Sequence, residues 1–245
     1  MPVDLDLVLP GAAAVWGAVV GLLVPRGAYR FSVEPEEHWR DRCPDGHLIG
    51  GWIGTARCRA GGGHVYGPSG ALVATVTAVV CLLLAAATGT RPELGVWLLL
   101  APVGVLLAVV DHKVQRLPDV LTLPLAAAAL ALLGVSALLP EHAGDWLTSL
   151  YGALALGGGY FVLFLINPNG MGFGDVKLAL GLGAVLGWYG WPVVVLGTFA
   201  GFLFGGLYGL VLVVARGAGR KTAMPFGPFL ISGAFVGLLI GAYAA

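Results

Sequence analysis

The sequence predicts an all-α membrane protein, a polytopic bundle of about eight transmembrane helices. Three observations support this fold class. Of the 245 residues, 58% are hydrophobic and only 11% are charged, which is unlike a soluble domain of this size. Several apolar runs reach the roughly 20 residues that cross a bilayer core. The 40 glycines suit the close packing of helices in lipid.

The apolar runs place the spans in order along the chain. We expect these spans at 7–25, 70–88, 94–110, 119–139, 148–166, 176–190, 192–214 and 226–244. A polar stretch, 26–69, follows the first span and is the only sizeable segment outside the membrane. We therefore divide the chain into residues 1–69, which hold the first span and this polar segment, and a membrane-embedded core of residues 70–245. The N-terminus has no basic cluster, so we expect no cleaved signal peptide.

The lysines and arginines predict how the spans are oriented, because cytoplasmic loops carry an excess of both. If residues 26–69 are cytoplasmic and the spans alternate, every lysine and arginine except Arg91 lies on the cytoplasmic side. These residues are Arg26, Arg30, Arg40, Arg42, Arg57, Arg59, Lys113, Arg116, Lys177, Arg216, Arg220 and Lys221. The opposite side then carries Asp4, Asp6, Glu93, Glu141 and Asp145. We expect a multi-pass protein of the plasma (inner) membrane, in contact with lipid.

Two aspartates at the ends of apolar runs are the candidate catalytic residues. Asp111 follows the third run and Asp175 precedes the sixth, so the predicted orientation brings both to the cytoplasmic face. Carboxylates at the membrane are costly and indicate function by default. Two close carboxylates share a proton, which suits the activation of water. The alternatives are structural: Asp175 as a helix cap, and Asp111 in a salt bridge with Lys113 or Arg116.

Three motifs contain or follow these aspartates. A D-x6-P-[ND]-x-L pattern is formed by Asp111, Pro118, Asp119 and Leu121. Within the stretch 167–177, a G-x-G-D-x-K pattern is formed by Gly172, Gly174, Asp175 and Lys177. The last apolar run opens with Pro225, Phe226, Gly227 and Pro228.

These motif residues have expected roles around the aspartates. We expect Pro118 and Asp119 to start a helix. The glycines of the second motif let a substrate backbone approach Asp175 or form an interhelical turn. Lys177 either extends to the membrane interface or acts electrostatically on the aspartates. Pro225 and Gly227 shape the start of the last span near the site.

In this order and topology, the motifs resemble those of the type IV prepilin peptidases, a family of intramembrane aspartic proteases. Presenilin-type proteases share G-x-G-D, but their first aspartate usually follows a tyrosine, and here Val110 precedes Asp111. The resemblance covers residues 70–245 well and the first 70 only partly. It implies an endopeptidase that removes the leader of prepilins or pseudopilins at the cytoplasmic face, with Asp111 and Asp175 as the catalytic pair. It implies no cofactor for the cleavage and no nucleic-acid partner.

The polar segment departs from the family pattern. Bifunctional members of the family carry two C-x-x-C pairs there, which form a zinc site and accompany N-methylation with S-adenosylmethionine. Here Cys43 and Cys58 are kept, but Gly46 and Gly61 replace the second cysteine of each pair. We therefore expect neither zinc nor S-adenosylmethionine, and weak or absent methylation. The alternative left open is a Cys2His2 site formed by Cys43, His47, Cys58 and His64.

Two other functions remain as alternatives to a protease. In a transporter, Asp111 and Asp175 would relay protons or cations. Such a path needs carboxylates or polar residues through the bilayer, yet the third to sixth spans are nearly free of ionisable groups between their ends. An inactive pilus-assembly scaffold is the third hypothesis, and the presence of both aspartates argues against it.

Overall fold

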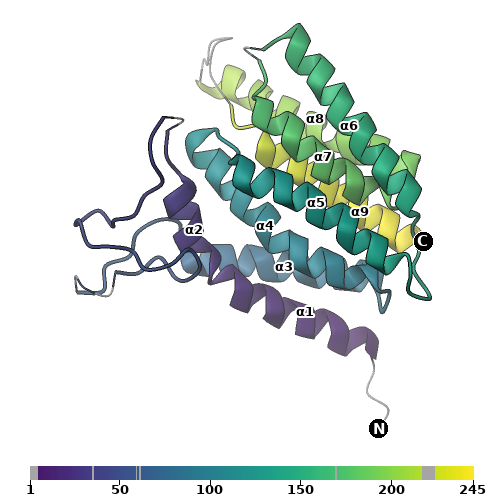
Figure 1. Cartoon of the computed structure of the whole chain (residues 1–245), viewed down its shortest axis with the longest axis horizontal. Coiled ribbons are helices and arrows are strands. Elements are labelled where there is room, and N and C mark those ends of the chain that lie inside the picture. The colour runs from purple at the N-terminus through teal and green to yellow at the C-terminus, as the bar shows by residue number, and fades with distance from the viewer. Residues whose placement is uncertain (1–4, 35, 59, 61, 169, 217–223) are drawn as a thin grey trace. The chain divides into compact units, whose positions relative to one another are not determined.

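The computed structural model describes residues 5–34, 36–58, 60, 62–168, 170–216 and 224–245. Within these ranges the regular elements are helices, which confirms the all-α class (Figure 1). The described residues also form two isolated β-bridges, both in the polar segment. The helices are α1 (Leu5–Gly21), α2 (Val24–Phe31), α3 (Gly70–Thr88), α4 (Glu93–Val114), α5 (Asp119–Ser136), α6 (Trp146–Ile166), α7 (Phe173–Gly187), α8 (Trp191–Arg216) and α9 (Gly227–Ala244). Residues named above that lie outside the described ranges are Asp4, Arg59, Gly61, Arg220 and Lys221.

The described helices confirm a multi-pass membrane protein but support fewer than eight spans. Those long and apolar enough to cross a membrane are α3, α4, α5, α6, α8 and α9. Helices α1 and α2 pass the same test together, with a bend of 43° between them, which brings the number to seven at most. The remaining expected span is α7, whose 15 residues make it about 22 Å long, short of the roughly 30 Å hydrocarbon core.

Three of the helix boundaries that differ from those expected change the place of a charged residue. Helix α4 continues to Val114, so Asp111 lies inside it, and α7 begins at Phe173, so Asp175 lies in its first turn. Arg26 belongs to the short helix α2 rather than to a loop. The physical reason is common to all three. Polar residues are tolerated in the first and last helical turns, where backbone groups need other partners, so an apolar run is shorter than its helix.

The chain forms two compact units, and each is described by itself. The first contains α1–α3 and Leu94–Arg116, and the second contains Arg91–Glu93 and Leu117–Ala245. The expected division after residue 69 was based on membrane topology and stays a prediction.

In the first unit, α1 packs along α3 through glycines. A Cβ placed on Gly17 would lie 2.9 Å from the Cα of Ala78, and one on Gly21 would lie 2.8 Å from the Cα of Ala74. Small residues of this kind let helix backbones approach closely in lipid. The two helices, one before and one after the polar segment in the sequence, therefore form a closely packed pair.

The polar segment of the first unit folds locally around α2. Arg26 anchors it, because its guanidinium donates hydrogen bonds to the carbonyls of Gly50 at 2.7 Å and Ile53 at 3.1 Å. The Phe31 ring stacks on Trp52 with centroids 4.8 Å apart. The segment thus has defined packing without long regular elements.

In the second unit, α7 is the central helix and contacts α5, α6, α8 and α9 (Figure 1). Against α6 the backbones meet at Gly152 and Gly183, where an added Cβ on either would overlap the other residue. The buried Ser149 hydroxyl donates to the Ala184 carbonyl at 2.6 Å across the same interface. Because its neighbours enclose it, α7 holds the residues at its N-terminus in defined positions.

Candidate functional site

Asp175 is a buried carboxylate at the N-terminus of α7, with only 6% of its surface exposed. The N–H of Gly172 donates to Asp175 Oδ2 at 3.2 Å, and the N–H of Asp175 donates to the Gly172 carbonyl at 3.0 Å. Gly172 is therefore the N-cap residue, and Asp175 lies three residues later, where a carboxylate bonds back to the cap. The helix dipole favours negative charge at this position. Asp175 is thus not the N-cap residue itself, but its side chain takes part in capping α7, as the structural alternative supposed.

The two glycines before Asp175 differ in what they contact. A Cβ on Gly174 would lie 2.9 Å from the Cβ of Leu117, a buried residue two positions before the start of α5. A Cβ on Gly172 would meet nothing closer than Asp175 Oδ2 at 3.5 Å, an ordinary contact. Packing therefore requires glycine at 174, whereas Gly172 is exposed and extended, with φ −74° and ψ 144°.

Lys177 forms an ion pair with Asp119, which the sequence did not predict. Its Nζ lies 2.6 Å from Asp119 Oδ2 and 4.8 Å from the centre of the Phe173 ring. Pro118 is the N-cap of α5 and Asp119 its first residue, so the expected helix start is confirmed. The pair joins the N-termini of α5 and α7 beside Asp175.

Asp111 is buried in the last turn of α4, with 4% of its surface exposed. Its carbonyl accepts a hydrogen bond from the N–H of Gln115 at 2.8 Å, and Gln115 ends the helix with a left-handed φ of 51°. The helix dipole disfavours a carboxylate at a C-terminus, and burial adds to the cost of its charge. Asp111 and Asp175 belong to different units, so their pairing stays a prediction.

The Pro-Phe-Gly-Pro segment starts the last helix, as expected, because α9 begins at Gly227 with Phe226 as its N-cap. The Phe226 ring lies 5.5 Å from Phe202, and Phe202 lies 5.8 Å from Tyr160 of α6. A role of Pro225 and Gly227 near the catalytic residues stays a prediction.

Tyr160 is a candidate that sequence reasoning missed. It is buried, and its hydroxyl has no hydrogen-bond partner among the described residues. A single tyrosine in an apolar helix carries no motif that would have identified it.

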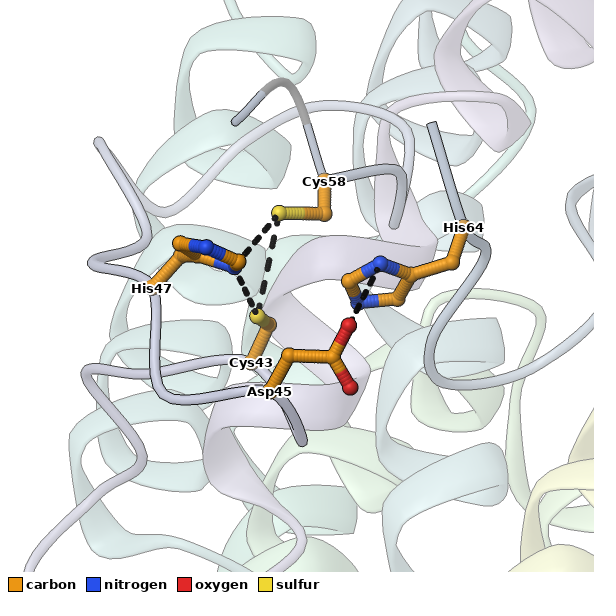
Figure 2. A network of polar contacts seen from close by, with 5 residues as sticks. All are labelled: Cys43, Asp45, His47, Cys58 and His64. Atoms are coloured by element: carbon orange, nitrogen blue, oxygen red, sulfur yellow. Dashed lines mark hydrogen bonds and ion pairs between the residues drawn. The ribbon is translucent and has the colours of Figure 1, made fainter. Parts of the chain in front are cut away.

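A second cluster lies in the polar segment of the first unit (Figure 2). The sulfurs of Cys43 and Cys58 are 3.7 Å apart, and each lies 3.6 Å from Nδ1 of His47. Nearby, Nδ1 of His64 lies 3.1 Å from Asp45 Oδ2. Burial opposes ionisation of the Cys43 thiol, but hydrogen bonds from His47, from the Asp45 amide and from Cys58 outweigh it and lower the pKa to about 6. Thiolate and imidazole are the ligands that zinc prefers, so these residues fit such a metal.

Comparison with known proteins assigns the family. The model of the type IV leader peptidase family matches residues 98–210, a range that includes Asp111 and Asp175. Leader peptidase HopD of Salmonella typhimurium is 32% identical over 142 residues, which are 56% of this chain and 86% of that protein. The chain belongs to the type IV leader peptidase family. The resemblance inferred from the motifs is therefore confirmed.

Longer members of the type IV leader peptidase family match more of the chain. The prepilin leader peptidase/N-methyltransferase of Aeromonas salmonicida (strain A449) is 35% identical over 178 residues, 69% of this chain and 56% of that protein. The protein of the same name from Pseudomonas aeruginosa is 32% identical over 187 residues, 75% of this chain and 61% of that protein. The chain thus spans little more than half the length of these relatives. No solved structure matches it.

Proposed function

We propose that this member of the type IV leader peptidase family is a membrane-embedded aspartic endopeptidase. It removes the leader peptide of prepilin-like proteins at the cytoplasmic face of the plasma membrane. The observation that carries the proposal is the buried carboxylate of Asp175 in a G-x-G-D turn at the start of α7. Family membership and the names of the relatives supply the reaction class.

In the proposed mechanism Asp111 and Asp175 act as a pair that shares one proton. The ionised member takes a proton from water as the oxygen attacks the scissile carbonyl, and the protonated member donates a hydrogen bond to that carbonyl. The tetrahedral intermediate then collapses as a proton passes to the leaving amine. No covalent bond to the enzyme forms.

Two features support the participation of Asp111. Both aspartates are buried at helix ends, and burial makes the charged form of a carboxylate costly. The chain itself also limits their separation. Leu117 follows Asp111 by only six residues, at most about 21 Å of extended chain, and packs on Gly174 next to Asp175.

The turn before Asp175 offers a place for the substrate backbone. Gly172 is exposed and extended, so a second extended strand can lie beside it. Gly174 packs on Leu117 and holds the turn in place. In the proposed complex, the residues on either side of the cleaved bond lie along Gly172 and the scissile carbonyl faces Asp175.

The proposed activity is peptide cleavage, with N-methylation weak or absent. The two longer relatives carry both activities in their names. Gly46 in place of the second cysteine of the first pair is the departure that carries this expectation. Mass spectrometry of the processed pilin, in a host without other such enzymes, tests it: a quantitative N-methyl group on the new N-terminus would contradict it.

Co-expression with a prepilin in a host lacking other prepilin peptidases tests the cleavage. We expect leader loss in the gel, and a new N-terminus at the end of the leader by mass spectrometry. The matched control is the prepilin without the leader peptidase. If a panel of membrane-inserted prepilins stays uncleaved by well-expressed wild-type protein, the proposed activity is wrong.

A further inference from the structure

We propose that Cys43, His47, Cys58 and His64 form a tetrahedral zinc centre that holds together the two loops of the polar segment. The ligand set differs from the two C-x-x-C pairs of the bifunctional family members, because His47 and His64 take the places of the missing cysteines at shifted positions. None of these residues belongs to the proposed catalytic pair, so the centre does not depend on the proposed function.

The two loops are built alike, which is the first observation behind this proposal. Each begins with a cysteine directly after one residue of an isolated antiparallel bridge, Arg42 with Leu48 in the first loop and Arg57 with Val65 in the second. In each loop the cysteine N–H donates to a histidine carbonyl at 2.9 Å. The donor and acceptor residues are Cys43 with His47 and Cys58 with His64. Each loop thus presents one sulfur and one imidazole from equivalent places.

The distances match those of a metal tetrahedron. With Zn–S of about 2.3 Å and Zn–N of about 2.05 Å, the S···S edge is about 3.8 Å and the S···N edge about 3.6 Å. The Cys43–Cys58 sulfurs are 3.7 Å apart, and both S···N distances to His47 are 3.6 Å. Three corners of a Zn²⁺ site are therefore already formed by ligand atoms that converge on one point.

The fourth corner is assigned to His64. In Figure 2 its ring lies across the sulfur pair from His47. Asp45 of the first loop contacts Nδ1 of His64 in the second at 3.1 Å, so the carboxylate favours a proton on Nδ1. A histidine held in this way presents Nε2 to a metal, the common arrangement of metal-binding histidines. His64 lies outside the converged group of three and joins it by reorienting its side chain.

The surroundings indicate a structural role for the metal. The two cysteines are 5% and 6% exposed and pack with Ala56 and Tyr66 in one small cluster. Binding bonds Zn²⁺ to the two sulfurs as their protons leave, and it closes both loops at once. With four protein ligands no position is left open for a substrate, which is typical of structural sites.

Metal content and cobalt spectroscopy of the purified full-length protein in detergent test the centre. We expect one zinc per chain, and on replacement by Co²⁺ the intense visible bands of a tetrahedral site together with thiolate charge-transfer absorption. Cys43→Ser and Cys58→Ser should lose the metal. Cys81→Ser is the matched control and should keep it, because Cys81 is buried on α3 in a separate cluster. The spectrum of the wild-type protein needs no variant to fold.

The fourth ligand has its own test. His64→Ala should change the cobalt bands, and Asp45→Asn should weaken metal binding by roughly 10–100-fold without changing the ligand set. Unchanged bands in His64→Ala would overturn the assignment of His64. Metal retained in a Cys43→Ser/Cys58→Ser double variant would overturn the centre as a whole. So would a metal-free wild-type protein, or one with a Cys43–Cys58 disulfide under reducing purification.

Discussion

The Nζ of Lys177 lies 2.6 Å from Oδ2 of Asp119 and ties the first turn of α7 to the first residue of α5. Leu117, two residues before Asp119, packs on Gly174 at the same place. The N-termini of α5 and α7 are thus joined by one ionic and one apolar contact directly beside the buried Asp175.

The ion pair should stabilise the protein only modestly. The Asp119 side chain is 59% exposed, so solvent screens it, although that of Lys177 is 19% exposed. A double-mutant cycle with Asp119→Ala and Lys177→Ala, read from unfolding in detergent, should give a coupling free energy of about 0.5–1 kcal/mol. Lys177→Met is the control that keeps an aliphatic contact with Phe173. A coupling free energy of zero would contradict the expected stabilisation by this pair.

Gly174→Ala should reduce cleavage far more than Gly172→Ala. The added methyl group at 174 meets Leu117 at 2.9 Å and forces the turn away from α5, whereas at 172 it has room. A shift of about 1 Å near catalytic groups costs on the order of 10²-fold in rate. Rates of leader removal should therefore fall about 100-fold for Gly174→Ala and less than tenfold for Gly172→Ala. Equal rates for the two variants would contradict this packing.

Gly152→Ala should destabilise the second unit, while Gly158→Ala on the same helix should not. A Cβ at 152 would overlap the carbonyl of Gly183 in α7, and one at 158 meets nothing within 4 Å. Overpacking costs about 1–3 kcal/mol, whereas alanine at a free helical position gains up to about 1 kcal/mol. The measurement is the thermal unfolding of both variants in detergent. A Gly152→Ala protein as stable as the Gly158→Ala protein would show that α6 and α7 are less closely packed than described.

Arg26→Met should open the loop that Arg26 anchors. The guanidinium bonds the carbonyls of Gly50, Ile53 and Thr55, and the Arg26 N–H bonds that of Gly54. Limited proteolysis should cut residues 50–55 several-fold faster in the variant, and Arg26→Lys should rescue only part of the protection, because an ammonium lacks the planar fork of donors. The matched control is Arg57→Met. No change in the cutting rate would show that these bonds do not hold the loop.

Some elements were predicted to the residue because local signals mark their ends. Helix α3 was expected at 70–88 and found at Gly70–Thr88. The Ser69 side chain accepts from the Leu72 N–H at its start, and Gly89 ends it with a φ of 65°. Helix α7 lacks such signals. Its N-cap and first turn contain two glycines and a carboxylate, so the apolar run begins later than the helix does.

Sequence likewise predicted some features of the candidate site and missed others. Asp111 and Asp175 could be identified from sequence, because a carboxylate at the edge of an apolar run is costly and conspicuous. The Asp119–Lys177 pair joins two helices far apart in sequence, and no local pattern encodes it. The cysteine loops show a further limit. Sequence spacing suggested a broken metal site, whereas the backbone turns bring His47 to both sulfurs.

The most direct test of the central claim compares Asp111→Asn, Asp175→Asn and Asp119→Asn with the wild type. The measurement is the initial rate of leader removal from a prepilin, with equal amounts of each enzyme in lipid vesicles. Loss of either member of an acid–base pair should lower the rate by roughly 10²–10⁴-fold, so Asp111→Asn and Asp175→Asn should be nearly inactive. Asp119→Asn should stay within about tenfold, since it loses only a surface ion pair. Cleavage at the wild-type rate by Asp111→Asn or Asp175→Asn would contradict the catalytic pair.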